Sequence, residues 1–102
     1  MALVVQKYGG SSLADAQQIH NVAGRIAKTQ DKGTKVVVVV SAMGDTTDEL
    51  MSLAHQVSQR PDPRELDLLL STGELVSCTL MAMALRSMGH KAISLSGAQA
   101  GV

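Results

Sequence analysis

The sequence predicts an α/β domain with a mainly parallel sheet. Short valine-rich runs alternate with longer segments whose apolar residues recur at helical spacing, and the expected order is β-α-β-α-α-α-β with short connections. A further observation is the run of consecutive valines at Val36–Val40. A strand of this kind has no polar side, so we expect helices to cover both faces of its sheet.

The first strand and the first helix flank a glycine-rich turn. We expect a strand over Ala2–Tyr8, followed by a capping signal in which Ser12 precedes Asp15. The apolar stripe of the helix has the spacing i, i+3, i+4 and i+7, at Ile19, Val22, Ala23 and Ile26. Cationic residues followed by glycine, at Lys32–Gly33, predict the end of this helix.

Two more helices are expected after the valine strand. The first begins near Thr46 or Thr47, and its apolar stripe consists of Leu50, Leu53, Ala54 and Val57. The segment RPDPRE then breaks the helical pattern. Asp62–Pro63 predicts the N-cap and the first position of a short helix that continues through Leu70.

The last helix and the last strand complete the expected order. STGE, residues 71–74, interrupts the pattern, and a fourth helix then runs to about Met88, where Gly89 ends it. This helix is apolar on nearly all sides, so we expect it inside a core. Lys91–Ser96 is predicted as a third strand, and GAQAGV, residues 97–102, as a glycine-bearing loop.

Composition and charge exclude several classes of function. The chain has 102 residues, 45% of them hydrophobic, and its nine basic and nine acidic residues cancel. Without net positive charge, and with Tyr8 as its single aromatic residue, it has no signature of nucleic-acid or membrane binding. Cys78 is the only cysteine and Val36–Val40 is too short to span a bilayer. We therefore expect a soluble cytoplasmic protein.

Polar residues follow two of the predicted strands, where ligands bind in open α/β sheets. Lys7 supplies a cation, and Gly9, Gly10 and Ser11 follow it. The glycine amides can be approached closely and can adopt positive φ, and the next helix N-terminus adds partial positive charge. This combination suits a phosphate group, although a tight strand-to-helix turn without a ligand explains the same glycines. The second strand end is Ser41–Thr47.

Other polar residues have simpler explanations. The sequence contains neither G-x-x-x-x-G-K-[ST] nor G-x-G-x-x-G, so a nucleotide would need a different scaffold. Glu74 stands at an expected helix start, where a carboxylate is favourable without any ligand. His20, His55 and His90 fall in a helix, a helix and a turn, and we expect them to be surface or packing residues.

Four segments together resemble the aspartokinases of the amino-acid kinase family: VQKYGGSSL, VVVVVSAMGDTTDELMSLA, LLLSTGELVSCTLMAMAL and SGAQAGV. The resemblance spans essentially all 102 residues, and its most specific blocks are SAMGDTTDEL and LLSTGE. It implies a three-layer α/β/α catalytic domain. Residues 1–102 would be the N-terminal part of that domain, with the remainder and the regulatory domains beyond residue 102.

The resemblance also implies an activity and a site. The activity is ATP-dependent phosphorylation of the L-aspartate side chain to 4-phospho-L-aspartate, the first step towards lysine, threonine, methionine and isoleucine. Lys7 would be catalytic, lying against the transferring phosphoryl group. The ATP phosphates would contact Lys7, Gly9, Gly10 and Ser11, and aspartate would contact Ser41, Thr47 and, through its α-amino group, Glu74. Mg²⁺ would arrive with ATP, since no set of metal ligands is spaced in the sequence as a cage.

The chemistry of the acceptor fits this activity. A carboxylate is already ionised at neutral pH, so phosphoryl transfer to it requires positioning and charge stabilisation rather than a general base. We expect residues 1–102 alone to be inactive and to self-associate through unpaired sheet edges. Alternatives are a non-catalytic phosphate- or aspartate-binding piece, and a related kinase acting on glutamate or acetylglutamate, which SAMGDTTDEL and Glu74 disfavour.

Overall fold

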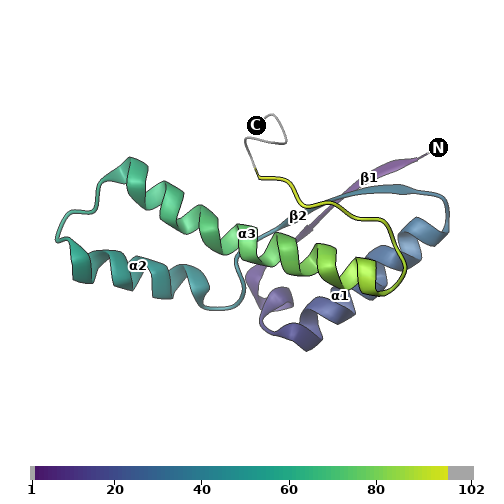
Figure 1. Ribbon diagram of the computed structural model, residues 1–102, viewed down its shortest axis with the longest axis horizontal. Helices are drawn as coiled ribbons and strands as arrows, with labels where there is room; N and C mark the ends of the chain where they lie inside the picture. The colour runs from purple at the N-terminus through teal and green to yellow at the C-terminus, as the bar shows by residue number, and fades with distance from the viewer. Residues whose placement is uncertain (1, 97–102) are drawn as a thin grey trace.

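The computed structural model describes residues 2–96, which form an α/β fold (Figure 1). Strands β1 (Leu3–Tyr8) and β2 (Lys35–Val40) pair in parallel, in a register that places Leu3 opposite Lys35 and Tyr8 opposite Val40. Helix α1 (Ala16–Asp31) makes the crossover between them. The carboxyl ends of both strands therefore meet at one edge of the sheet.

The predicted start and end of α1 are largely confirmed. The N-cap is Asp15, whose Oδ1 accepts a hydrogen bond of 2.8 Å from the amide of Gln18. Ser12, the other half of the predicted signal, lies instead in a short 3-10 helix, η1 (Gly10–Leu13). At the other end Gly33 has a φ of +83°, the left-handed conformation that a glycine after a helix commonly adopts.

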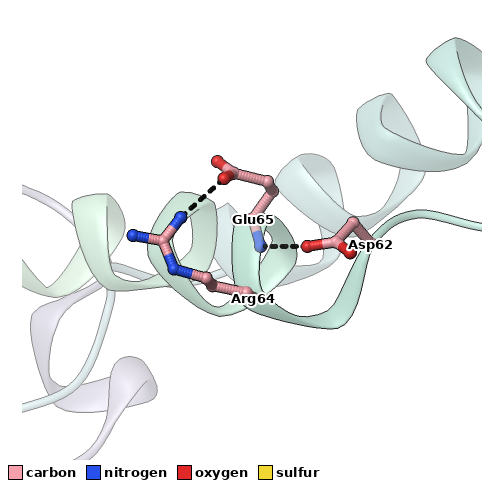
Figure 2. A network of polar contacts seen from close by, with 3 residues as sticks. All are labelled: Asp62, Arg64 and Glu65. Atoms are coloured by element: carbon pink, nitrogen blue, oxygen red, sulfur yellow. Dashed lines mark hydrogen bonds and ion pairs between the residues drawn. The ribbon is translucent and has the colours of Figure 1, made fainter.

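Helices α2 (Thr46–Val57) and α3 (Pro63–Ser87) form a hairpin that extends to one side of the sheet (Figure 1). The predicted cap of α3 is confirmed, because Asp62 Oδ2 accepts a 3.1 Å hydrogen bond from the amide of Glu65 (Figure 2). The same glutamate pairs with Arg64 at 2.8 Å. Both partners of that ion pair are largely exposed, so it contributes little to stability.

The predicted break between the third and fourth helices is wrong. Helix α3 runs without interruption through residues 71–74. The Ser71 hydroxyl donates to the carbonyl of Leu68 at 2.7 Å, and the Thr72 hydroxyl donates to the carbonyl of Leu69 at 2.6 Å. These side chains bond to their own helix, so residue types that usually favour turns are accommodated inside it.

The predicted third strand is also absent from the described residues. Lys91–Ser96 has no sheet pairing, although its side chains alternate between exposed and half-buried as those of β1 and β2 do. Side-chain contacts hold this part of the chain in place. Arg86 Nε donates to the carbonyl of Ala92 at 2.8 Å, and just before the segment His90 Nε2 lies 2.9 Å from Asp31 Oδ1. The loop predicted over residues 97–102 lies outside the described residues.

The core lies on one side of the sheet, where α1 and α3 pack against β2. Its buried residues are Leu13, Ile19, Val22, Ala23, Ile26, Ala27, Met81, Ala84 and Leu85. Val36, Val38 and Val40 of β2 pack against this cluster, whereas Val37 and Val39 point the other way and are 49% and 46% exposed. The expectation that helices cover both faces is therefore wrong for residues 2–96.

Helix α3 differs from its predicted environment as well. Its residues Gly73, Ser77, Met81, Ala84 and Leu85 are buried, but Leu75, Val76 and Met83 are 40–63% exposed, so one side only is in the core. Because α3 is continuous, it is long and apolar enough to cross a bilayer by length and composition alone, which the sequence reasoning missed. Its packing against α1 identifies it as a core helix of the domain.

Candidate functional site

The two polar strand ends lie side by side at the carboxyl edge of the sheet. The amide of Ser41 donates to the carbonyl of Tyr8 at 3.1 Å, which extends the β1–β2 ladder by one bond. Beyond it, the amide of Gly44 donates to the carbonyl of Gly10 at 3.0 Å. We call residues 9–13 the first loop and residues 41–47 the second loop; these bonds hold the two together.

Neither glycine of the first loop has positive φ, and only Gly10 is needed for space. Gly9 has a φ of −84°, and neither it nor Gly10 is among the residues with positive φ. A Cβ at Gly10 would lie 3.0 Å from the backbone oxygen of Ala42, closer than real Cβ atoms usually come. A Cβ at Gly9 would meet nothing within 4 Å. Gly10 therefore allows the two loops to touch, while the backbone at Gly9 faces open space.

The donors available in the first loop come from its own turn. Helix α1 begins at Ala16, and the Asp15 carboxylate already accepts from the amide of Gln18 at its N-terminus, so that carboxylate offsets the partial positive charge expected there. The 3-10 turn starts directly after Gly9, whose carbonyl accepts from the amide of Ser12 at 3.1 Å. The first amides of such a turn, those of Gly10 and Ser11, have no acceptor within it.

Lys7 lies near the same edge, on the open face of the sheet. It is exposed and pairs in register with Val39, one residue before β1 ends. Within residues 2–96 its ammonium makes no salt bridge or side-chain hydrogen bond. An unpartnered lysine beside a loop with free amides is a suitable arrangement for binding an anion such as a phosphate group.

Ser41 and Thr47 are both placed on the second loop, as predicted. Ser41 follows β2 directly and is half-buried, whereas Thr47 is exposed in the first turn of α2. The turn between them is closed by the amide of Thr46, which donates to the carbonyl of Met43 at 2.9 Å. Gly44 has a φ of +44° in this turn.

Glu74 adjoins Gly73, the residue at which α3 contacts the second loop. A Cβ at Gly73 would lie 3.0 Å from Ala42 Cβ and 3.2 Å from Thr46 Cγ2, so α3 rests directly on the second loop at this residue. Glu74 is the next residue and is exposed. The glutamate predicted at a helix start therefore lies in the middle of α3, which removes the helix-dipole explanation for it.

Sequence reasoning missed Ala42 and Gly73, the residues through which the three motifs meet. Ala42 is 5% exposed and has Gly10 on its carbonyl side and Gly73 against its methyl group. A signal was present in the sequence, because a glycine inside an apolar helical stretch usually marks close packing. Treating STGE as a helix boundary hid that signal.

Neither of two hollows in the described residues coincides with this site. One, of about 240 Å³, lies between α1, β2, α3 and residues 91–93. The other, of about 330 Å³, lies between α1 and α3 and is also lined by Met43 of the second loop. No predicted site residue lines either of them. Residues 2–96 also contain no group of three metal-ligating side chains. The site is thus an open edge made of backbone amides, one lysine, hydroxyl groups and one glutamate.

The fold and this edge define an α/β protein whose strand-end loops are suited to holding a phosphorylated ligand. Comparison with known proteins identifies the class more closely. The model of the amino acid kinase family matches residues 2–102, and the chain belongs to that family.

The chain is similar to aspartokinases along its whole length. It is 63% identical over 102 residues to the aspartokinase of Mycolicibacterium smegmatis, 60% to that of Corynebacterium glutamicum and 55% to that of Geobacillus stearothermophilus. These comparisons cover all of this chain but only 24–25% of each relative. The chain therefore spans about a quarter of the length of these relatives.

A solved structure, the crystal structure of aspartate kinase from Synechocystis, has the same fold. It superposes with a TM-score of 0.90 at 52% identity, covering 92% of this chain and 16% of its own chain. A TM-score this high indicates that the two chains share the fold over the superposed residues.

Proposed function

We propose that this chain provides the phosphate- and aspartate-binding edge of a kinase that phosphorylates the side-chain carboxylate of L-aspartate with ATP, giving 4-phospho-L-aspartate. In this proposal residues 1–102 are the N-terminal part of the catalytic domain. The observation that carries it is the meeting of three motifs, KYGGSS, SAMGDTT and STGE, at Ala42. Membership in the amino acid kinase family and similarity to aspartokinases support the same activity.

The first loop is the phosphate end of the proposed site. The residues present fit ATP, because Lys7 has no partner within residues 2–96 and the space above Gly9 is empty. We propose that the amides of Gly10 and Ser11 donate to phosphate oxygens. Lys7 would neutralise charge that develops on the transferred phosphoryl group, which is the main requirement of such a transfer.

The second loop and α3 form the substrate end. We propose that Ser41 and Thr47 donate hydrogen bonds to an aspartate carboxylate and that Glu74 accepts from its α-amino group. The positions of Ser41 and Thr47 on the second loop, and of Glu74 next to the α3 residue that contacts this loop, support the proposal. An ionised acceptor needs no base, so we propose that the chain's residues orient the carboxylate in line with the phosphate and exclude competing acceptors. Mg²⁺ bound with ATP would add positive charge at the phosphate oxygens.

The similarity to aspartokinases supports a proposed setting for the enzyme. We propose that the enzyme is cytoplasmic and acts at the start of lysine, threonine, methionine and isoleucine synthesis, as the resemblance implies. We further propose that residues 1–102 alone do not turn over, because a chain that spans a quarter of its relatives leaves most of their residues unrepresented.

Trapping of the acyl phosphate tests the substrate. The gene product that carries this sequence, at its natural length, is incubated with Mg-ATP, hydroxylamine and, in separate reactions, aspartate, glutamate or acetylglutamate. Aspartyl hydroxamate is expected with aspartate alone. Hydroxamate from glutamate or acetylglutamate, and none from aspartate, would leave the family assignment standing and contradict the proposed substrate.

A further inference from the structure

The contact between Gly73 and Ala42 leads to a further inference. We propose that Gly73 is a positioning residue for the aspartate end of the site: its lack of a side chain sets how closely α3 approaches the second loop, and so where Glu74 stands relative to Ser41 and Thr47. This inference rests on the proposed function and adds a residue to which that function assigns no role.

The contact is tight and involves three residues of the segment that follows β2. A Cβ at Gly73 would lie 3.0 Å from Ala42 Cβ, 3.2 Å from Thr46 Cγ2 and 3.6 Å from Leu50 Cδ1. Ala42 is buried, and its methyl group is fixed to the backbone, so it cannot rotate away as the end of a flexible side chain would. A side chain at residue 73 must therefore displace α3 or the second loop.

The helix itself gives no reason for a glycine at this position. Glycine in a helix interior is less favourable than alanine by about 1 kcal/mol. Gly24, inside α1, provides the contrast, because a Cβ there would meet nothing within 4 Å. One turn after Gly73, Ser77 is fully buried, and its hydroxyl donates to the Gly73 carbonyl at 3.4 Å. The next buried residue on this side of α3 after Gly73 is therefore also small.

The two partners of the contact are held by different parts of the fold. Ser41 is bonded through its amide to Tyr8 of β1, so the start of the second loop moves with the sheet. Glu74 adjoins Gly73 on α3 and moves with the helix. A displacement of α3 at residue 73 would therefore shift Glu74 relative to Ser41, while Lys7 stays in the sheet.

The test is a substitution in the gene product at its natural length. Gly73→Ala is expected to raise the KM for aspartate by about tenfold, a modest loss for a misplaced binding group, and to leave the KM for ATP within about twofold. Gly24→Ala is the matched control, since it makes the same change in a helix with open space around it, and should leave both KM values unchanged.

A second substitution tests the contact itself. Ala42→Gly removes the opposing methyl group, so the double variant Gly73→Ala/Ala42→Gly should recover most of the aspartate KM. If Gly73→Ala does not accumulate as folded enzyme, Ala42→Ser enlarges the same contact from the other side. It is expected to raise the aspartate KM in the same selective way.

The outcomes separate this inference from the proposed function. An unchanged aspartate KM in Gly73→Ala, an equal rise in both KM values, or no recovery in the double variant would overturn the positioning role. If the unaltered protein forms no aspartyl hydroxamate, the proposed function fails, and the inference about aspartate fails with it. In that case Tm values for the two single variants and the double variant still show whether residues 73 and 42 are coupled.

Discussion

At the scale of single residues, Ala42 connects the functional motifs of the chain. Its carbonyl oxygen faces Gly10 of the first loop and its methyl group faces Gly73 of α3. The sequence identified Gly10 by its pattern, which suggested both close approach to the backbone and positive φ. The structure shows a close approach, but between Gly10 and the backbone of the second loop, and Gly10 does not have positive φ.

This distinction gives a prediction about stability. Gly10→Ala places a methyl group 3.0 Å from the Ala42 carbonyl oxygen, and backbone cannot yield as a flexible side chain can. We expect the free energy of unfolding to fall by about 1–3 kcal/mol, the usual effect of overpacking. Gly9→Ala, with open space around the added methyl, is the control and should change it little. Chemical denaturation of the natural-length protein measures the free energy of unfolding of both variants. An equal loss of this free energy in the two variants would contradict the account.

The residue types at the site were predictable, but their surroundings were not. Lys7 lies at the end of β1, and Ser41 and Thr47 follow β2, so their common edge could be inferred from the sequence before the structure. The position of Glu74 could not be inferred in this way, because it depends on which face of α3 contacts the second loop. The contact of Gly73 with Ala42 determines that face, and these residues are far apart in the sequence. The hydrophobic periodicity of a helix gives no information about such a contact.

At the scale of elements, the reliable signals were those with a local physical cause. Asp15 and Asp62 cap α1 and α3 through their own carboxylates, and Gly33 and Gly89 follow helix ends with positive φ, as expected. The sequence signals that gave wrong predictions were those of elements that need a partner distant in the sequence. Lys91–Ser96 has the alternation of a strand, but within the described residues it is not paired with another strand.

The cap of α1 provides a prediction at this scale. Asp15→Ala removes the acceptor for the Gln18 amide, and α1 carries five of the buried residues of the core. We expect a loss of about 1 kcal/mol in the free energy of unfolding. Asp15→Asn keeps a side-chain oxygen and should lose much less. A similar loss in both variants, measured by denaturant titration, would show that the cap is not the cause.

At the scale of the whole molecule, residues 2–96 leave one face of the sheet open. Leu3, Val5, Val37 and Val39 on that face are 46–67% exposed. The radius of gyration is 15.2 Å, compared with about 13 Å for a compact domain of 100 residues. The run Val36–Val40 predicted a sheet covered on both sides, and the described residues supply one layer of helices.

The open face predicts how residues 1–102 behave when made alone. We expect this polypeptide to self-associate, because contiguous apolar surface and unpaired strand edges both favour contact between copies. Changing Val37 to Lys and Val39 to Glu places charges on the open face and should shift the polypeptide towards monomer. Sedimentation velocity measures this shift. Monomeric behaviour of the unaltered polypeptide over a range of concentrations would contradict the prediction.

The measurement that tests the central claim most directly is aspartyl hydroxamate formation by Lys7 variants of the natural-length protein. The account predicts hydroxamate from the unaltered protein and a loss of at least about a hundredfold in kcat for Lys7→Ala, since an electrostatic group is removed from the transferred phosphoryl. Lys35→Ala, at the opposite end of the same sheet, is the control and should keep its activity. Full activity in Lys7→Ala would contradict the account, because the carboxyl edge of the sheet would then not be where phosphate is transferred.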